Sequence, residues 1–492
     1  MKKIVCLILT GMMLCGCMIS CQKNGSEDTS TSVYTEAPDQ EEHDNVPAMN
    51  LDGFEFTILC RSTDVLYQEI TAETSSGDQV DIAVYNRNEA VKSRFNCKLN
   101  VTGVSESPAR TLMETFRKSV ISGASEYHLC LDHMMYTASE SLNGTMYNWN
   151  DLTHVDLSRP WWHQSLINEA SFGDKLMYCA SDYCLSSTYF TWLMIFNTVM
   201  CREHNIDVYE MVENGTWTID NFIALVNTLY QDDNGDSIQD VNDIYGFTTH
   251  YNTAVTNWMF ALNVPVLKVN DDATYEIKLN SDRMINAVEK VYRLLFESTN
   301  GTLYLNAKRL GEYGIKDHDQ AVTSIFANKK TVFAATRIFA LENLRSSDTE
   351  YGIVPYPKYD EEQSEYYSHV DGRASMMFIP YNLPDSIEEK VSAIVEVLSF
   401  YSYRDVMPVI ENVALLGRYS TDSQAYQMLQ KTLAGRTYAF AYLHRDNTGK
   451  LYWMLSDMMA EDNYNFVSEW KKKERSAQRS VDALIEKLND LE

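Results

Sequence analysis

The chain has 492 residues, a formal net charge of −28, and many aromatic residues, including 31 Tyr and 8 Trp. That length is more than one hydrophobic core usually serves, so the chain is expected to form two lobes. The excess of acidic side chains argues against nucleic acid as a partner, because a phosphate backbone requires a basic face. A single arginine that grips an anionic ligand is still compatible with this charge.

The N-terminus predicts an export signal. Met1-Lys2-Lys3 precedes an apolar run over residues 4–14, which is too short to span a membrane as a mature helix. Two lipobox-like ends follow, before Cys17 and before Cys21. We predict a lipoprotein signal peptide over 1–20 and lipidation of Cys21, because the sequence turns polar just after it. Cys17 is the runner-up, and an ordinary secretory signal is the alternative. The expected location is the extracytoplasmic face of a bacterial membrane.

Residues 21–48 are predicted to form a disordered acidic tether. Their composition is mostly Ser, Thr, Asp, Glu, Pro and Asn, with few large apolar residues. Such a segment buries too little apolar surface to offset the entropy of ordering it.

Strands and helices are predicted to alternate once the tether ends. The patterns indicate strands over 54–59, 98–102 and 127–132, with helices over 81–95 and 111–121 between them. This alternation is typical of an α/β fold with a largely parallel sheet.

Six cysteines lie beyond the predicted anchor Cys21, each in apolar surroundings, and most are predicted to be small buried hydrophobes. They are Cys60, Cys97, Cys130, Cys179, Cys184 and Cys201. Only Cys179 and Cys184 are close enough in sequence for a local bridge, and spacing alone does not decide whether they pair.

A helix followed by an acidic loop stands out at 215–247. Thr218 is predicted to cap the helix. The loop over 232–243 then places oxygen ligands at positions 1, 3, 5, 7, 9 and 12 of a calcium-type pattern, where position 7 contributes its backbone carbonyl. The predicted structural Ca²⁺ ligands are Asp232, Asn234, Asp236, Ile238, Asp240 and Asp243.

The loop departs from the EF-hand pattern in three positions. Gly235 precedes the usual glycine position, Ser237 occupies it, and Asp243 stands where a longer Glu is usual. The alternative interpretation is a solvated Asn-Gly turn between a helix and a strand.

The same stretch carries a family resemblance. It contains Trp217-Thr218-Ile219-Asp220, an Asp-x-Asn-Gly-Asp run at 232–236 and Tyr245-Gly246-Phe247. With the blocks at 328–337 and 351–358, it resembles the family 1 extracellular solute-binding proteins, which are the sugar-binding lipoproteins of ABC importers.

The resemblance implies a periplasmic-binding-protein-like fold of two α/β lobes with a ligand cleft between them. Lobe 1 would comprise 49–184 with 374–402, and lobe 2 would comprise 188–370 with 404–492. The chain would cross between them near 184–188, 370–374 and 401–404. A monomer would bind a saccharide or sugar derivative and present it to membrane permease subunits.

The resemblance also implies which side chains line the cleft. Asp182, Arg337 and Arg373 would take pairs of hydroxyls or an acidic group, and Trp258 and Trp453 would stack on sugar rings. Each has an alternative role: the tryptophans as core residues, and the arginines as surface or inter-lobe ion-pair partners.

Catalytic signatures are missing from the sequence. It contains no Gly-x-Ser-x-Gly, His-Glu-x-x-His, Gly-x-x-x-x-Gly-Lys or Gly-x-Gly-x-x-Gly pattern. We therefore predict a binding protein and not an enzyme. Two alternatives stay open: a surface-anchored glycan hydrolase with paired carboxylates, and a glycan-binding lipoprotein without a role in transport.

Overall fold

The computed structural model describes most of the chain beyond the predicted signal. The described ranges are 42–72, 78–107, 109–124, 126–240, 242–270, 274–298, 301–312, 317–415 and 423–491. The predicted signal peptide, with Cys17 and Cys21, lies outside them. All the described residues belong to one compact unit.

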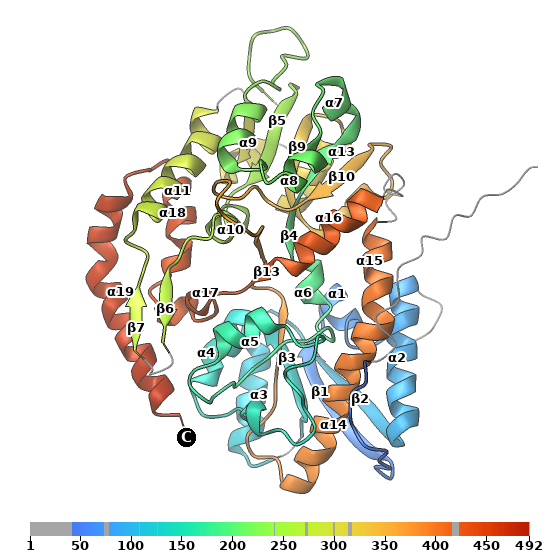
Figure 1. Ribbon diagram of the computed structural model, residues 1–492. Helices are drawn as coiled ribbons and strands as arrows, with labels where there is room; N and C mark the ends of the chain where they lie inside the picture. The colour runs from blue at the N-terminus through green and yellow to red at the C-terminus, as the bar shows by residue number, and fades with distance from the viewer. Residues whose placement is uncertain are drawn as a thin grey trace, which may run out of the picture. The chain divides into compact units, whose positions relative to one another are not determined.

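Lobe 1 is built on a four-stranded sheet in the order β12-β3-β1-β2 (Figure 1). Its strands are β1 (Phe54–Arg61), β2 (Cys97–Val104), β3 (Leu129–His133) and β12 (Ser375–Phe378). Strand β1 runs parallel to β2 and β3, while β12 pairs antiparallel with β3. The predicted strands and the largely parallel sheet are confirmed here.

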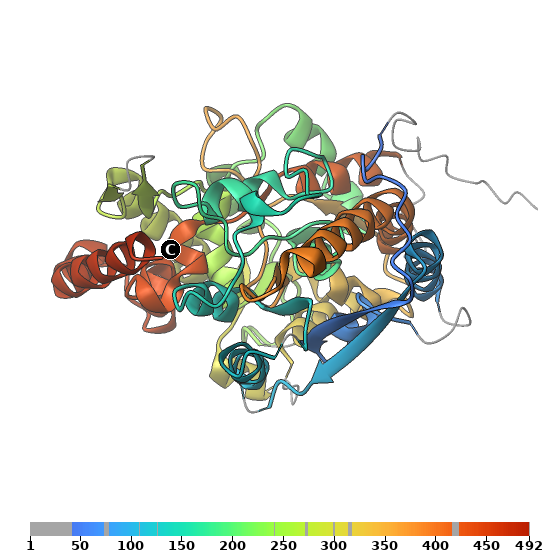
Figure 2. The same cartoon turned by 90° about the horizontal axis from the view of Figure 1, so that it is seen from below.

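Helices from several segments of the chain pack around this sheet. They are α1 (Asp64–Gln68), α2 (Gln79–Phe95), α3 (Thr111–Ile121), α4 (Met134–Ser141), η1 (Trp149–Asp151), α5 (Gln164–Ala170) and α14 (Asp385–Tyr401). The Asp78 carboxylate caps α2 by accepting the backbone N–H groups of Val80 and Asp81. Helices α2 and α14 pack against each other on one side of the sheet (Figure 2).

Lobe 2 is built on a five-stranded sheet in the order β10-β4-β9-β5-β8. Its strands are β4 (Trp192–Asn197), β5 (Tyr245–His250), β8 (Thr302–Leu305), β9 (Thr331–Arg337) and β10 (Tyr351–Val354). Strand β5 is parallel to β8 and β9, whereas β4 is antiparallel to β9 and β10. Every residue of β4 and β9 is buried, which explains their nearly continuous apolar runs.

The helices of lobe 2 include α9, which the sequence predicts. They are α6 (Ser186–Tyr189), α7 (Thr198–Glu203), α8 (Val208–Glu213), α9 (Ile219–Val226), α10 (Thr253–Ala261), α11 (Asp282–Tyr292), η2 (Arg293–Glu297), α12 (Ala307–Glu312), α13 (His318–Ala327) and η3 (Ile338–Leu344). Thr218 caps α9 by accepting the backbone N–H of Asn221 at 3.4 Å, as the sequence predicts.

The remaining elements include short strand pairs and the C-terminal helices. They are β6 (Leu267–Val269), β7 (Tyr275–Ile277), β11 (Ser368–His369), η4 (Ser402–Val406), α15 (Met407–Leu415), α16 (Ser423–Ala434), β13 (Arg436–Thr437), α17 (Phe440–Leu443), η5 (Arg445–Asn447), η6 (Leu451–Trp453), α18 (Met454–Ala460) and α19 (Phe466–Asn489). Helix α16 packs on β10 of lobe 2, but α17 contacts α4 and α5 of lobe 1. The predicted placement of 404–492 in lobe 2 alone is therefore too simple.

The predicted tether ends earlier than expected. The Asp44 carboxylate accepts hydrogen bonds from both terminal nitrogens of Arg94, at 2.6 and 2.8 Å, and Val46 is buried in the core of lobe 1. The prediction was wrong for these residues because polar composition does not reveal a specific buried ion pair.

One buried network in lobe 1 holds all three chain crossings. The Glu69 carboxylate accepts the backbone N–H of Ser186 at 2.7 Å and the hydroxyl of Ser375 at 2.5 Å. The Arg87 guanidinium donates to the hydroxyl of Ser402 at 3.2 Å. Because each serine lies at or beside a different crossing, the network ties the hinge region to lobe 1.

The six described cysteines are buried and free, so Cys179 and Cys184 do not form a bridge. Burial raises the pKa of the Cys60 thiol to about 12, which keeps it protonated and apolar in character. Among the residues that the structure describes, no helix is both long enough and apolar enough to cross a membrane.

Candidate ligand-binding site

Parallel strands in both sheets end in polar side chains. In lobe 1, β1 ends at Arg61 and β3 ends at His133; in lobe 2, β5 ends at His250 and β9 ends at Arg337. Ligands of open α/β sheets bind at the carboxyl ends of parallel strands, so these ends mark the candidate site.

A cavity of about 320 Å³ lies at the strand ends of lobe 1. We call it the strand-end cavity. It is lined by Arg61, Ser105, Glu106, Ala109, Arg110, Thr111, Leu112, Asp132, His133, Tyr136 and Arg373. Its volume lies at the lower end of the roughly 300–1,000 Å³ that is usual for small-molecule pockets.

Arg61 organises the floor of the strand-end cavity. Its guanidinium donates to Glu106 at 3.2 Å, to the backbone oxygen of Arg373 at 2.8 Å and to the hydroxyl of Ser375 at 2.9 Å. Its Nε lies 3.6 Å from the Asp132 carboxylate. One buried arginine therefore joins β1 to the crossing that leads into β12.

Two further arginines form the rim of this cavity. Arg110 lies over the ring of Tyr136, at 4.5 Å from its centroid, and pairs with Asp446 at 3.0 Å. The side chain of Arg373 is 46% exposed and lies 3.9 Å from Glu106. A planar, partly open guanidinium beside an aromatic ring is well suited to grip paired hydroxyls or an anionic group.

Burial controls the charge of the acidic and basic groups here. It raises the pKa of Asp132 to about 6, although Arg61 opposes the shift. It lowers the pKa of His133 to about 3, an effect that Arg61 reinforces. The imidazole of His133 is thus neutral at pH 7; its Nδ1 accepts the backbone N–H of Met135, which leaves the Nε2–H as a donor.

A second charged network lies at the strand ends of lobe 2. The Arg337 guanidinium donates to Asp319 and lies 3.4 Å from a carboxylate oxygen of Asp371, in the second crossing. The His250 ring nitrogen lies 3.8 Å from Asp319. Arg337 also lies over the Trp192 ring, at 5.5 Å from its centroid. This lobe-2 network connects β5 and β9 to the hinge.

Several atoms of the lobe-2 network have no hydrogen-bond partner among the described residues. They are Nε of Arg337, Oδ1 of Asp319, Oδ2 of Asp371, Nε2 of His250 and Nε1 of Trp192. Buried polar atoms in folded proteins are normally paired, so such a group needs a water or a ligand as its partner.

Opposite charges stabilise the ionised carboxylates of this network. Burial by itself would raise the pKa of Asp319, but Arg337 and His250 outweigh it and hold the pKa below its usual range. The pKa of Asp371 is lowered in the same way, with Arg337 again overcoming burial. Both carboxylates are acceptors at neutral pH.

The structure brings three of the five predicted ligand residues toward this region. Arg337 and Arg373 approach the same ring, Phe190, each at 5.4 Å from its centroid. Trp453 is half-buried, and Arg445, the neighbour of Asp446, lies 5.8 Å from its ring centroid.

The other two lie elsewhere. The Asp182 carboxylate contacts a ring nitrogen of His163 at 3.2 Å within lobe 1. Trp258 is fully buried, with its ring 4.9 Å from that of Tyr356, so neither of its faces is free in this conformation. Ligand binding by all five residues stays a prediction.

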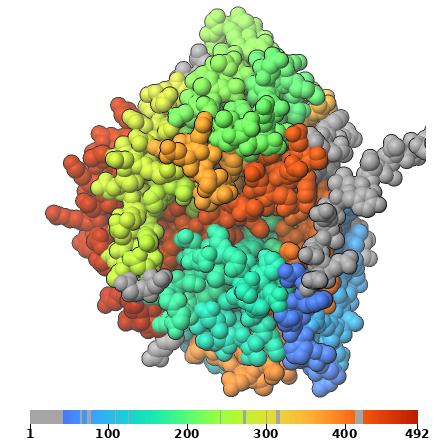
Figure 3. Space-filling model, viewed as in Figure 1, coloured from blue at the N-terminus to red at the C-terminus, as the bar shows by residue number. Residues whose placement is uncertain are grey.

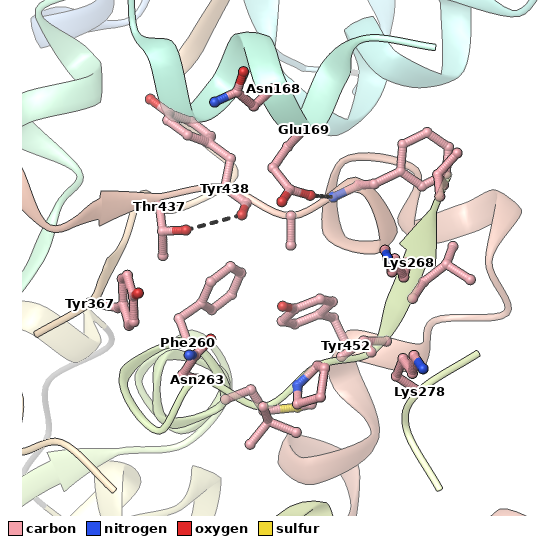
Figure 4. A pocket seen from close by; sticks show the side chains of 18 of the residues that line it. Asn168, Glu169, Phe260, Asn263, Lys268, Lys278, Tyr367, Thr437, Tyr438 and Tyr452 are labelled. Carbon is pink, nitrogen blue, oxygen red and sulfur yellow. Dashed lines mark hydrogen bonds between the residues drawn. The ribbon is translucent and has the colours of Figure 1, made fainter. Parts of the chain in front are cut away.

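A larger cavity of about 1100 Å³ lies at another part of the lobe boundary. It is bordered by α5 of lobe 1, by the end of α10 and β6 of lobe 2, and by residues 437–440 (Figure 4). Figure 3 shows the face on which the teal surface around α5 meets the yellow-green and red segments.

The predicted calcium loop is closed by its own hydrogen bonds. Asp232 accepts the backbone N–H groups of Gly235 and Ser237, and Asp236 accepts that of Ile238 at 2.7 Å. Asp243 is buried and accepts the hydroxyl of Tyr230. Among the described residues, no group of three or more acidic, histidine or cysteine side chains is arranged to hold a metal ion. Calcium binding by this loop therefore stays a prediction.

Sequence reasoning missed most of the strand-end cavity. Arg61, Glu106, Arg110, Asp132 and Tyr136 were not among the predicted ligand residues. A usable signal was present for two of them: Arg61 lies two residues beyond the first predicted strand, and Asp132 ends the third, where parallel strands present side chains to a cleft.

Neither family models nor curated proteins match the chain. Solved structures do match over nearly their full lengths. The cyclic α-maltosyl-1,6-maltose-binding protein from Arthrobacter globiformis is 12% identical, with a TM-score of 0.57 and coverage of 88% of this chain and 99% of that one.

Two other solved structures are similarly related. A sugar transporter protein from Rhizobium etli in an open conformation is 10% identical, with a TM-score of 0.55 and coverage of 89% and 100%. UgpB from Mycobacterium tuberculosis, in complex with glycerophosphocholine, is 12% identical, with a TM-score of 0.55 and coverage of 88% and 99%. At these identities the likeness establishes the fold: the chain has the two-lobed, periplasmic-binding-protein-like α/β fold of these solute-binding proteins.

Proposed function

We propose that this protein is the lipid-anchored, extracytoplasmic substrate-binding protein of an ABC importer for a carbohydrate. The observation that carries the proposal is the meeting of charged strand ends from both lobes at the chain crossings. Arg61 reaches the second crossing from lobe 1, and Arg337 reaches it from lobe 2. The likeness to solved solute-binding proteins supports the same function.

The side chains present suit a hydroxyl-rich ligand. Arg373 and Arg110 offer planar donors at the cavity rim, and Tyr136 offers an aromatic ring. The atoms around Arg337 that lack hydrogen-bond partners are buried donors and acceptors, which water or a sugar hydroxyl admitted by lobe opening can satisfy. A ligand that contacts both lobes favours the closed state, and a permease can recognise that state.

The first test is a thermal-shift screen of the full chain in detergent. The panel contains oligosaccharides, monosaccharides and sugar phosphates, and each stabilising compound is recovered and checked for cleavage. A tight ligand raises the melting temperature by linkage. An intact stabilising sugar supports a transport receptor; a cleaved sugar supports the hydrolase alternative and contradicts our proposal.

The second test places the ligand. Arg373→Ala is expected to weaken the stabilising sugar by tenfold or more, because it removes a partly exposed guanidinium without touching the core. Arg202→Ala, which removes an exposed arginine paired with Glu350 in lobe 2, is the matched control. Equal affinity of the two variants for the sugar would exclude the strand-end cavity as the binding site.

We also propose that Cys21 carries the lipid. Cys21→Ala is expected to release the protein from membranes into the soluble fraction, whereas Cys17→Ala is expected to leave it attached. The reverse pattern would assign the anchor to Cys17.

Finally, we propose that the 232–243 loop binds Ca²⁺ as a structural ion. The spacing of its oxygen side chains supports this. Binding requires the Asp232 and Asp236 carboxylates to exchange their backbone partners for the ion. Such an ion would stabilise lobe 2 without taking part in ligand chemistry.

A further inference from the structure

Five Asn-Gly pairs occur in the chain, and none of them takes part in the ligand binding proposed above. They start at Asn24, Asn143, Asn214, Asn234 and Asn300. The structure describes three of these pairs in full, at Asn143, Asn214 and Asn234. The three pairs have the same two residues in very different surroundings, so their chemical reactivities can be compared.

An Asn-Gly pair can react with itself. The backbone nitrogen of the glycine attacks Cγ of the asparagine side chain, because glycine has no Cβ to hinder the approach. A new N–Cγ bond replaces the Cγ–Nδ2 bond: the glycine nitrogen gives up its proton, and the side-chain nitrogen takes one up and leaves as ammonia. Water then opens the cyclic imide at either carbonyl carbon and leaves aspartate or isoaspartate. Water is the only other reactant.

The fold controls this reaction through hydrogen bonds. The asparagine side chain must swing onto its own backbone, and the glycine N–H must be free to lose its proton. A pair whose reacting groups are hydrogen-bonded in the folded state reacts only after a local opening. Its rate is therefore lowered by the equilibrium constant of that opening.

The pair at Asn234 is held by three hydrogen bonds. The N–H of Gly235 donates to the Asp232 carboxylate at 2.7 Å. The side-chain amide of Asn234 donates to the Asp236 carboxylate at 2.8 Å, and its oxygen accepts the backbone N–H of Asp236 at 3.1 Å. Both reacting groups of this pair are thus occupied.

The pair at Asn214 is held through its glycine. The N–H of Gly215 donates to the backbone oxygen of Val212 at 3.2 Å. A Cβ atom at Gly215 would lie 3.1 Å from Nζ of Lys358, a residue that is only 4% exposed. That ammonium group in turn donates to the backbone oxygen of Gln363 at 2.9 Å. The backbone at Gly215 is therefore fixed by its neighbours.

The pair at Asn143 is open. It follows α4 in lobe 1, and both Asn143 and Gly144 are exposed. Neither the side chain of Asn143 nor the N–H of Gly144 has a hydrogen-bond partner among the described residues. A Cβ atom at Gly144 would meet no atom within 4 Å. Both reacting groups of this pair are thus free.

From this contrast we infer that Asn143 is a site of spontaneous deamidation in the folded protein, whereas the fold protects Asn214 and Asn234. The inference does not depend on the proposed transport function. Its product is a carboxylate just beyond the C-terminus of α4, where the helix dipole disfavours negative charge. Because α4 carries Tyr136 and begins directly after His133, the modified helix is one that borders the strand-end cavity.

The experiment compares deamidation rates in the folded and unfolded states. The full chain is incubated at pH 8, once in detergent buffer and once with added denaturant, and is then digested and analysed by mass spectrometry. Peptides with Asn143, Asn214 and Asn234 are followed separately, and the unfolded sample gives the unprotected rate of each pair. The ratio of the two rates reports the effect of the fold alone.

We expect Asn143 to react in the folded protein within about threefold of its unfolded rate, because no hydrogen bond has to open first. Asn214 and Asn234 are expected to react at least about tenfold more slowly when folded than when unfolded. A tenfold protection of Asn143, or folded-state rates at Asn214 and Asn234 that equal their unfolded rates, would overturn the inference.

Two variants test the consequence for α4. Asn143→Asp introduces the charge of one product, and Asn143→Gln is the matched neutral control. We expect backbone amides in the last turn of α4 to exchange hydrogen about threefold faster in Asn143→Asp than in Asn143→Gln. Equal exchange in the two variants would overturn the effect of the modification on this helix.

Discussion

Two buried charged networks flank the chain crossings, and they differ in how completely their polar atoms are paired. In lobe 1, both oxygens of Glu69 accept hydrogen bonds, and all three guanidinium nitrogens of Arg87 donate to described acceptors. In lobe 2 and the second crossing, Arg337, Asp319 and Asp371 each retain an atom without a described hydrogen-bond partner, although the Asp371 atom lies 3.4 Å from Arg337 and the Asp319 atom lies 3.8 Å from His250.

This difference in hydrogen bonding distinguishes a structural network from a ligand-binding one. A fully paired buried network is rigid and has no capacity left for a ligand. A buried network with unpaired atoms carries a desolvation cost that an incoming donor or acceptor relieves. We therefore interpret Glu69 and Arg87 as hinge anchors, and the surroundings of Arg337 as a place where a polar ligand or water completes the hydrogen bonding.

Glu69→Ala is the strongest test of the scaffold. It leaves the Ser186 N–H and the Ser375 hydroxyl buried without their acceptor, so we expect a loss of about 3–5 kcal/mol in the free energy of unfolding. Denaturant titration measures this. Glu55→Ala, an exposed glutamate on β1, is the control and should leave the free energy of unfolding nearly unchanged. Similar losses in both variants would contradict the anchoring role.

Trp258→Ala tests whether Trp258 is a core residue of lobe 2 or a ligand-binding residue. Because the ring is fully buried, we expect a comparable loss of about 3–5 kcal/mol from the cavity left behind. Trp258→Phe keeps most of the packing and removes the unpaired indole N–H. If Trp258→Phe weakens sugar binding while stability is retained, the indole is a ligand contact after all.

Arg337→Lys tests whether the network around Arg337 binds ligand or only stabilises the fold. Lysine keeps the charge between Asp319 and Asp371 but loses the planar fork, so we expect ligand affinity to fall about tenfold, or roughly 1.4 kcal/mol, with a smaller change in stability. Calorimetry and thermal unfolding measure the two effects separately. A large stability loss with unchanged affinity would make the Arg337 network a second scaffold.

Glu396 provides a third network, which contains no cation. Its carboxylate accepts the indole N–H groups of Trp161 and Trp162, each at 3.1 Å, and burial raises its pKa to about 8. Because the folded-state pKa lies above the unfolded value of about 4.3, the folded state holds its proton more tightly. Its contribution to stability should therefore decline as pH rises from about 4.3 to 8.

Glu396→Gln is expected to remove that decline. Unfolding free energies of the wild type and the variant, measured at pH 5 and pH 8, give the comparison. Parallel pH profiles would show that Glu396 does not titrate in this range.

Asp236→Ala is expected to have the smallest effect, because the loop lies at the surface. We expect the melting temperature to fall by a few degrees in the presence of calcium, which corresponds to about 1 kcal/mol, and to change less in chelator. Asp348→Ala, an exposed aspartate elsewhere in lobe 2, is the control. An equal fall in melting temperature with and without calcium would contradict calcium binding by this loop.

The local elements of this chain follow from its sequence. The bounds of α3 were predicted to the residue, and Thr218 caps α9 as expected. Periodicity and capping depend on side chains within a few positions of one another, so they can be recognised without a tertiary structure. The cysteines were also correctly predicted to be mostly buried, whereas the sequence left open whether Cys179 and Cys184 pair.

The residues of the candidate site depended on long-range packing. The Glu69 carboxylate meets Ser375 across 306 positions, and Arg61 meets Arg373 across 312. Trp258 shows the converse, because its sequence neighbourhood did not reveal that both ring faces are covered.

The sequence by itself thus determined the first strands and helices of lobe 1, the capped helix α9 and the α/β class of the fold, because short-range periodicity encodes them. Which polar side chains face one another at the crossings was decided only by the tertiary structure. The chain passes between the lobes three times, and each passage brings residues from distant segments into one buried environment, where desolvation requires them to find partners.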